Sequence, residues 1–168
     1  MIDFLFRPAS IASLVYIRIC FGLIIFIDCL RYIGLGWVEK NFIRPGFRFS
    51  YAGFDWLPRL SEGPTYLLWG VTGLTALFVA FGFFYRLSSI VLFLGFSFIF
   101  LSEKAMYLNH FYFVVLMCFS FIFLSPHKYL SIDVRLNPSI RETWVPNWQP
   151  SLITVSYTHL TLPTTPYV

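Results

Sequence analysis

Four long apolar runs constrain this chain more than any other feature of its sequence. They cover residues 11–34, 65–84, 87–101 and 105–125. A helix needs roughly 20 mostly apolar residues to cross a hydrocarbon core about 30 Å thick. The third run is short for a full crossing, and the other three reach that length. Water cannot solvate such segments, so the runs predict an all-α membrane protein, a polytopic helical bundle with about four transmembrane helices.

The overall composition argues against a soluble protein. The chain has 168 residues, of which 58% are hydrophobic and 12% are charged, whereas soluble domains carry about 25% charged residues. The formal net charge is +4, but Lys and Arg are scattered over the loops without forming a run, so we do not expect nucleic acid as a partner. Basic residues divide equally between the two sides of the predicted bundle, so the positive-inside rule assigns no orientation.

The first apolar run contains three charged residues, Arg18, Asp28 and Arg31. A charge at the centre of a membrane helix costs about 2.5–3.5 kcal/mol on insertion scales, so these side chains should face protein. Asp28 and Arg31 are three residues apart and can neutralise each other on one helix. Arg18 has no acidic residue within a turn, so we expect it to reach another helix or backbone carbonyls and to anchor the bundle.

Residues 35–64 form a long connector in which aromatic residues alternate with Arg, Gly and Pro. Rings such as Tyr51, Phe54 and Trp56 can enter the headgroup zone of the membrane while basic side chains such as Arg44 stay in water. This pattern favours a segment that lies along the membrane interface over an ordinary surface loop.

Polar residues near the start of the fourth run are the candidates for a functional site. Asn109 and His110 need hydrogen-bond partners if they lie at membrane depth. Glu103 and Lys104 precede them, and they could pair with each other or with the charges of the first run, or they could form a solvated turn. The three histidines are far apart and show no metal-ligand spacing, so we expect no metal site.

Several short motifs occur in order along the chain. They are Tyr85-Arg86, Glu103-Lys104, Asn109-His110, and Ser131 with Asp133, preceded by an Arg, a Phe-Gly and a later Asp in IRICFGLIIFIDCLRY. No single motif is specific, but in their order and spacing the chain resembles the membrane domain of vitamin K-dependent gamma-carboxylases over residues 11–148. Bacterial members of this family are grouped as horizontally transferred transmembrane domain (HTTM) proteins.

The resemblance implies an enzyme that oxidises vitamin K hydroquinone with oxygen, generates a strong base, removes a proton from the γ-carbon of a glutamate and adds carbon dioxide there. It implies catalytic roles for His110, Asn109 and Lys104, leaves the residues that bind the hydroquinone unassigned, and implies no metal. For His110 the alternative is a packing histidine at the interface. The implied partners are membrane lipid and a glutamate-containing peptide or protein, in a bacterial cell membrane rather than the endoplasmic reticulum.

The chain departs from the family pattern near residue 150. The family continues after WVPNWQ into a helix that ends at the lysine base for the hydroquinone, whose amine pKa desolvation would depress. Here residues 151–168 are rich in Thr and Pro, which predicts a non-native tail from sequencing-adapter read-through or a disordered one. We therefore expect residues 1–150 to be the N-terminal part of a carboxylase-like domain, an inactive fragment without the catalytic lysine. The alternative is a non-enzymatic membrane bundle that binds a lipid or quinone or supports a partner.

Overall fold

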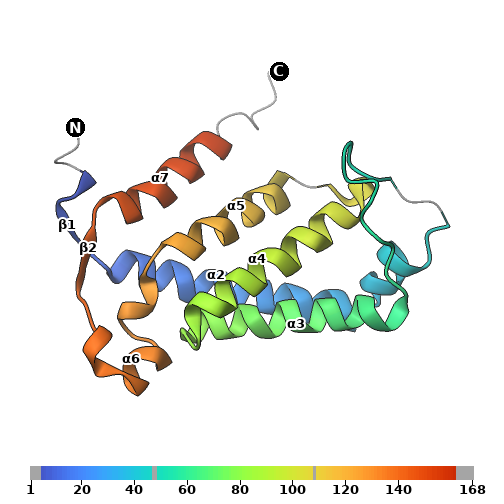
Figure 1. The fold of residues 1–168 in the computed structure, drawn as a ribbon. Helices are drawn as coiled ribbons and strands as arrows, with labels where there is room; N and C mark the ends of the chain where they lie inside the picture. The colour runs from blue at the N-terminus through green and yellow to red at the C-terminus, as the bar shows by residue number, and fades with distance from the viewer. Residues whose placement is uncertain (1–4, 47–48, 108, 162–168) are drawn as a thin grey trace.

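Long helices lying side by side form most of the molecule (Figure 1). The computed structural model describes residues 5–46, 49–107 and 109–161, except for the side chains of Asn109 and of residues 157–161. The long helices are α2 (Ala12–Gly34), α3 (Glu62–Phe81), α4 (Tyr85–Ser102), α5 (Asn109–Phe123) and α7 (Trp148–Thr161). Helix α2 packs against α3, α3 against α4, and α4 against α5. Helix α7 packs against α5.

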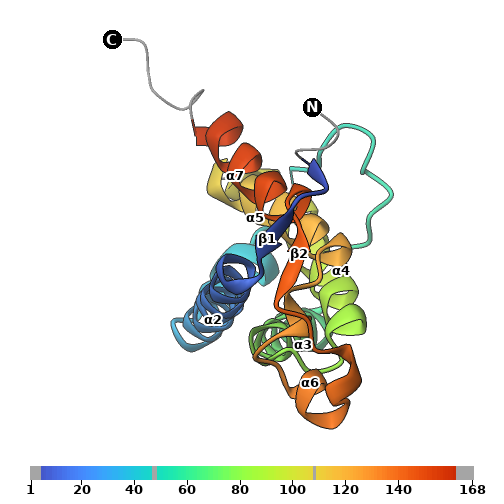
Figure 2. The same cartoon turned by 90° about the vertical axis from the view of Figure 1, so that its left-hand side faces the viewer.

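Short elements connect the helices. A two-stranded antiparallel sheet joins β1 (Pro8–Ser10) to β2 (Trp144–Pro146), with Pro8 opposite Pro146. Figure 2 shows this pair where α2 begins and α7 follows. The other short elements are helix α6 (Ile132–Leu136), a π-helical turn at Glu39–Ile43, and 3₁₀ turns at Lys104–Met106, Pro126–Lys128 and Pro138–Ile140.

Three of the described helices, α2, α3 and α4, are long and apolar enough to cross a membrane. The predicted class, an all-α integral membrane bundle, is confirmed. The fourth span was predicted at 105–125, and the structure makes it shorter. Residues Lys104–Met106 form a separate 3₁₀ turn, and the apolar helix is His110–Phe123. The third span is longer than predicted, since α4 begins at Tyr85 and has 18 residues.

Asp133 explains the early start of α4. Its carboxylate accepts the backbone N–H groups of Phe84 at 2.9 Å and Tyr85 at 3.0 Å, which would otherwise lack partners at a helix N-terminus. The Tyr85 hydroxyl donates to the carbonyl of Phe121 at 2.7 Å, and the ring of His127 stacks on the Tyr85 ring. Burial lowers the pKa of His127 to about 4, so this imidazole is neutral at physiological pH.

Small residues allow α2 and α3 to approach closely. A Cβ atom on Gly22 would lie 2.6 Å from the carbonyl oxygen of Ala76 and 2.8 Å from the Cβ of Ala80. Close backbone approach of this kind is the usual source of helix association in lipid, where apolar side chains gain nothing by leaving the solvent.

Arg18 ties α2 to the turn that follows α5. It is fully buried, and its Nη1 and Nη2 atoms donate to the carbonyls of Pro126 at 3.1 Å and Leu130 at 2.6 Å. Gly82, with φ of 65°, lies against the guanidinium, where a Cβ would be 2.6 Å from Nη1. The prediction that Arg18 reaches backbone carbonyls of another part of the bundle is confirmed. We call this end of the bundle the anchor end, and the opposite end, which carries residues 35–61 between α2 and α3, the connector end.

Helix α7 occupies much of the segment for which the sequence predicts a non-native or disordered tail, residues 151–168. The structure gives a helix up to Thr161. Ile153 is 8% exposed and packs in an apolar cluster with side chains of α2 and α5, which provides a physical reason for order here. Residues 162–168 lie outside the described part, and the non-native origin of the tail stays a prediction.

Replacing Arg18 with leucine should lower stability without preventing membrane insertion. The variant leaves the carbonyls of Pro126 and Leu130 without their donor, and hydrogen bonds to charged groups contribute about 1.5–3 kcal/mol each. We expect the free energy of unfolding to fall by about 3 kcal/mol, measured as a lower melting temperature in detergent. Arg44→Leu, which changes an exposed arginine paired with Glu39, is the matched control. An Arg18→Leu protein that melts together with the wild type would contradict the anchoring role.

Candidate functional site

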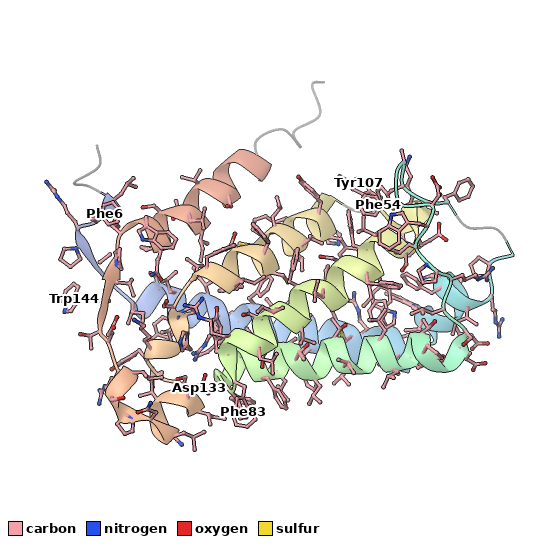
Figure 3. The ribbon with its side chains drawn as sticks, in the orientation of Figure 1. Phe6, Phe54, Phe83, Tyr107, Asp133 and Trp144 are labelled. Carbon is pink, nitrogen blue, oxygen red and sulfur yellow. The ribbon has the colours of Figure 1, made fainter. Side chains whose placement is uncertain are left out.

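A cavity of about 400 Å³ lies among α2, α3, α4 and α5 at the connector end. Seven aromatic side chains contribute to its wall: Tyr32, Trp37, Phe42, Trp69, Phe96, Phe100 and Phe111. We call it the aromatic cavity. Figure 3 shows Tyr107 and Phe54 at this end of the bundle, where the connector approaches the ends of α4 and α5. The volume is within the range of small-molecule sites, about 300–1,000 Å³.

Three charged side chains and one histidine also line the cavity: Asp28, Arg31, Glu103 and His110. Asp28 Oδ1 accepts a hydrogen bond from Arg31 Nη2 at 2.7 Å, so the predicted local neutralisation of these two charges is confirmed. The Arg31 guanidinium also lies 5.3 Å from the centre of the Trp37 ring, a cation–π distance. The cavity therefore has an ion pair on one side rather than an isolated charge.

Glu103 holds the connector to the end of α4. It is 8% exposed, and its Oε1 atom accepts the backbone N–H of Phe49 at 3.1 Å and of Ala105 at 3.2 Å. The Lys104 N–H donates in turn to the carbonyl of Phe49 at 2.8 Å. Both alternatives that the sequence left open for Glu103 are wrong within the described residues. The carboxylate is neither ion-paired nor in a solvated turn, because backbone amides already satisfy it.

Of the three predicted catalytic residues, the structure brings His110 to the aromatic cavity. Its ring projects from the first turn of α5 and contacts the Phe111 ring edge-to-face, with centroids 4.8 Å apart. Lys104 is exposed on the 3₁₀ turn and is not part of the cavity wall. The side chain of Asn109 lies outside the described residues. The catalytic roles of all three stay predictions.

Trp69 is the residue of the cavity wall that sequence reasoning missed. Its ring stacks on Tyr32, with centroids 4.6 Å apart and planes 14° apart. It is 3% exposed, and within the described residues its indole Nε1 has no hydrogen-bond partner. A buried donor without a partner costs about 1–3 kcal/mol. A tryptophan in an apolar run usually indicates core packing, so the sequence carried no signal that distinguished it.

Tyr51 adds a second unpartnered donor near the cavity. Its ring packs on Phe100, with centroids 5.5 Å apart, and its hydroxyl is buried without a partner among the described residues. Burial raises the pKa of Tyr51, and the neighbouring Tyr107 and Glu103 act in the same direction. The phenol is therefore protonated at neutral pH and remains a donor.

The arrangement defines a class of protein: a helical bundle with helices long and apolar enough to cross a membrane and a cavity at one end. The family model of the HTTM domain matches residues 6–162, almost the whole chain and beyond residue 150, where the predicted domain ends. The chain belongs to the HTTM family, whose domain is associated with vitamin K-dependent carboxylase-type proteins. No solved structure matches the chain.

Removing the Glu103 carboxylate should loosen the connector above the cavity. In Glu103→Ala the N–H of Phe49 loses a charged acceptor worth about 1.5–3 kcal/mol. We expect amide hydrogen exchange across residues 49–57 to become at least about tenfold faster, measured by mass spectrometry in detergent or nanodiscs. Glu39→Ala, which removes an exposed carboxylate from the same connector, should leave this exchange unchanged. Equal exchange in Glu103→Ala and wild type would show that Glu103 does not hold the segment.

Proposed function

We propose that the aromatic cavity binds vitamin K hydroquinone, and that the complete protein couples its oxidation by oxygen to carboxylation of glutamate in a peptide or protein. The observation that carries the proposal is an aromatic cavity of about 400 Å³ with a buried, unpartnered indole N–H, in a chain of the HTTM family. The hydroquinone supplies the reducing equivalents for epoxide formation and, through that oxidation, the strong base.

The residues of the cavity fit a flat, two-ring quinol. Aromatic side chains favour offset or edge-to-face contact with a planar ring at centroid distances of about 4.5–7 Å, and Tyr32 and Trp69 already form such a surface. The Trp69 indole N–H offers a hydrogen bond to a quinol oxygen and would then no longer be unpartnered. The aromatic side chains of the wall also exclude water from a bound ring, and each polar contact is stronger where water is absent.

His110 is the proton-transfer candidate in this wall. Imidazole is the commonest general acid–base group in enzymes, so His110 can accept a proton from a quinol hydroxyl or return one. The Asp28–Arg31 pair adds polar groups to the same cavity as an ion pair. In this proposal His110 moves the proton and Trp69 orients the ring.

A second candidate function is binding without catalysis, by a bundle that holds a quinone or lipid or supports a partner. One observation favours it: no lysine belongs to the described wall of the aromatic cavity, whereas the family uses a lysine base for the hydroquinone. The two candidates differ in one product, vitamin K epoxide, which only the enzyme forms.

Binding should depend on the Trp69 indole N–H. Trp69→Phe keeps an aromatic ring but removes the donor, and one hydrogen bond of about 1 kcal/mol corresponds to about a fivefold loss of affinity. We expect this loss for vitamin K hydroquinone, measured by anaerobic equilibrium binding to the protein in nanodiscs. Trp56→Phe, at a connector residue that is 73% exposed, is the control. Undiminished affinity in Trp69→Phe would remove the proposed contact.

Epoxide formation should depend on His110. General acid–base groups contribute about 100-fold or more to rate, so His110→Ala in the full-length protein should lower vitamin K epoxide production at least about 100-fold while insertion and quinol binding persist. Tyr112→Phe, on the same helix but outside the cavity wall, should retain the wild-type rate. An unchanged rate in His110→Ala would exclude it from the site. A wild-type protein that binds the quinol and forms no epoxide would support the binding candidate.

A further inference from the structure

A second large cavity, of about 570 Å³, lies at the anchor end beside helix α6. Its walls come from Ile19 of α2, Ala80 and Phe81 at the end of α3, residues 129–132, 134 and 135, and Arg141. We call it the anchor-end groove. Figure 1 shows α6 below the end of α3, at the end of the bundle away from the connector. The groove is thus separate from the aromatic cavity.

Two arginines line the groove without a carboxylate to neutralise them. Arg135 and Arg141 are both exposed, and within the described residues neither forms an ion pair. The nearby acidic side chains are already engaged. Glu142 pairs with Lys128 at 2.7 Å, and Asp133 accepts the backbone N–H groups at the start of α4. The groove therefore presents uncompensated positive charge.

The second arginine is also positioned by an aromatic ring. The guanidinium of Arg141 lies 5.4 Å from the centre of the Tyr129 ring. A cation–π contact of this kind restrains the side chain while leaving its N–H groups available. Guanidinium groups bind phosphate oxygens with two parallel hydrogen bonds, so this pair has the chemistry to hold a phosphate.

An exposed apolar stripe leads along α3 into the groove. Leu67, Leu74 and Phe81 are 67%, 49% and 53% exposed, and their seven-residue spacing places them on one side of the helix. Because α3 is long and apolar enough to cross the membrane, this side faces acyl chains. Phe81 is both the last member of the stripe and part of the groove wall. Positive charge therefore begins where the lipid-facing stripe ends.

We propose that the anchor-end groove is a binding site for an anionic glycerophospholipid of the surrounding membrane. The phosphate lies between Arg135 and Arg141, and an acyl chain follows the Leu67–Leu74–Phe81 stripe. Basic side chains at a membrane surface attract anionic lipid. The amphipathic shape of the groove, charged at the anchor end and apolar along α3, selects a lipid over a free anion.

The test compares lipids added to the full chain in a neutral detergent. All samples come from the same purification. Phosphatidylglycerol should raise the melting temperature of the wild type, and phosphatidylcholine should raise it less. In Arg135→Gln/Arg141→Gln, the amount of phosphatidylglycerol retained, measured by native mass spectrometry, should fall about tenfold. Lys40→Gln/Arg44→Gln removes two charges from the connector end and should retain lipid as the wild type does.

A charge-preserving variant separates binding from folding. Arg135→Lys/Arg141→Lys should keep part of the lipid selectivity, and the melting temperatures of all variants without added lipid show whether each is folded. The proposal is overturned if the wild type does not distinguish phosphatidylglycerol from phosphatidylcholine, or if the connector-end variant loses as much lipid. It is equally overturned if inorganic phosphate stabilises the wild type as well as phosphatidylglycerol does, since the groove would then recognise a free anion.

Discussion

The structure depends on the hydrogen bonds that a fully buried cation, Arg18, donates from the first helix to backbone carbonyls. Its two terminal nitrogens are bonded to the carbonyls of Pro126 and Leu130, so the cost of an arginine at membrane depth becomes a link between the first helix and the turn after α5. The same stretch of chain carries Asp133, which receives the exposed N–H groups at the start of α4. Polar groups that would each be unfavourable in lipid thus satisfy one another and fix three segments at one end.

The connector end of the bundle encloses the aromatic cavity. There the helices are joined by aromatic contacts, such as Tyr32 on Trp69, and by the Glu103 carboxylate that holds the backbone of the connector. In the proposed function, the rings at this end of the bundle receive a flat ligand. The family assignment makes a quinol the natural candidate.

The candidate site was only partly predictable from the sequence. His110 was identifiable because a histidine beside an apolar run needs a partner, and the Asp28–Arg31 pairing followed from helical spacing alone. The backbone partner of Glu103 and the place of Trp69 in the cavity wall were not. The partner of Glu103 is a backbone amide 54 residues earlier in the chain, and no side-chain pattern indicates a backbone donor. Trp69 resembles any other ring in a hydrophobic helix until its indole nitrogen is seen to be buried without an acceptor.

The sequence by itself determined that this chain is a helical membrane protein of the HTTM family and that Arg18 must find partners within the protein. These conclusions depend on hydrophobic length, on the cost of a buried charge and on the order of short motifs, all of which are local properties. Only the tertiary structure decided which carbonyls Arg18 contacts, which side chains surround the aromatic cavity, and that Lys104 lies outside it. Those outcomes depend on contacts between residues far apart in the chain, where small differences in packing, rather than composition or spacing, determine which atoms meet.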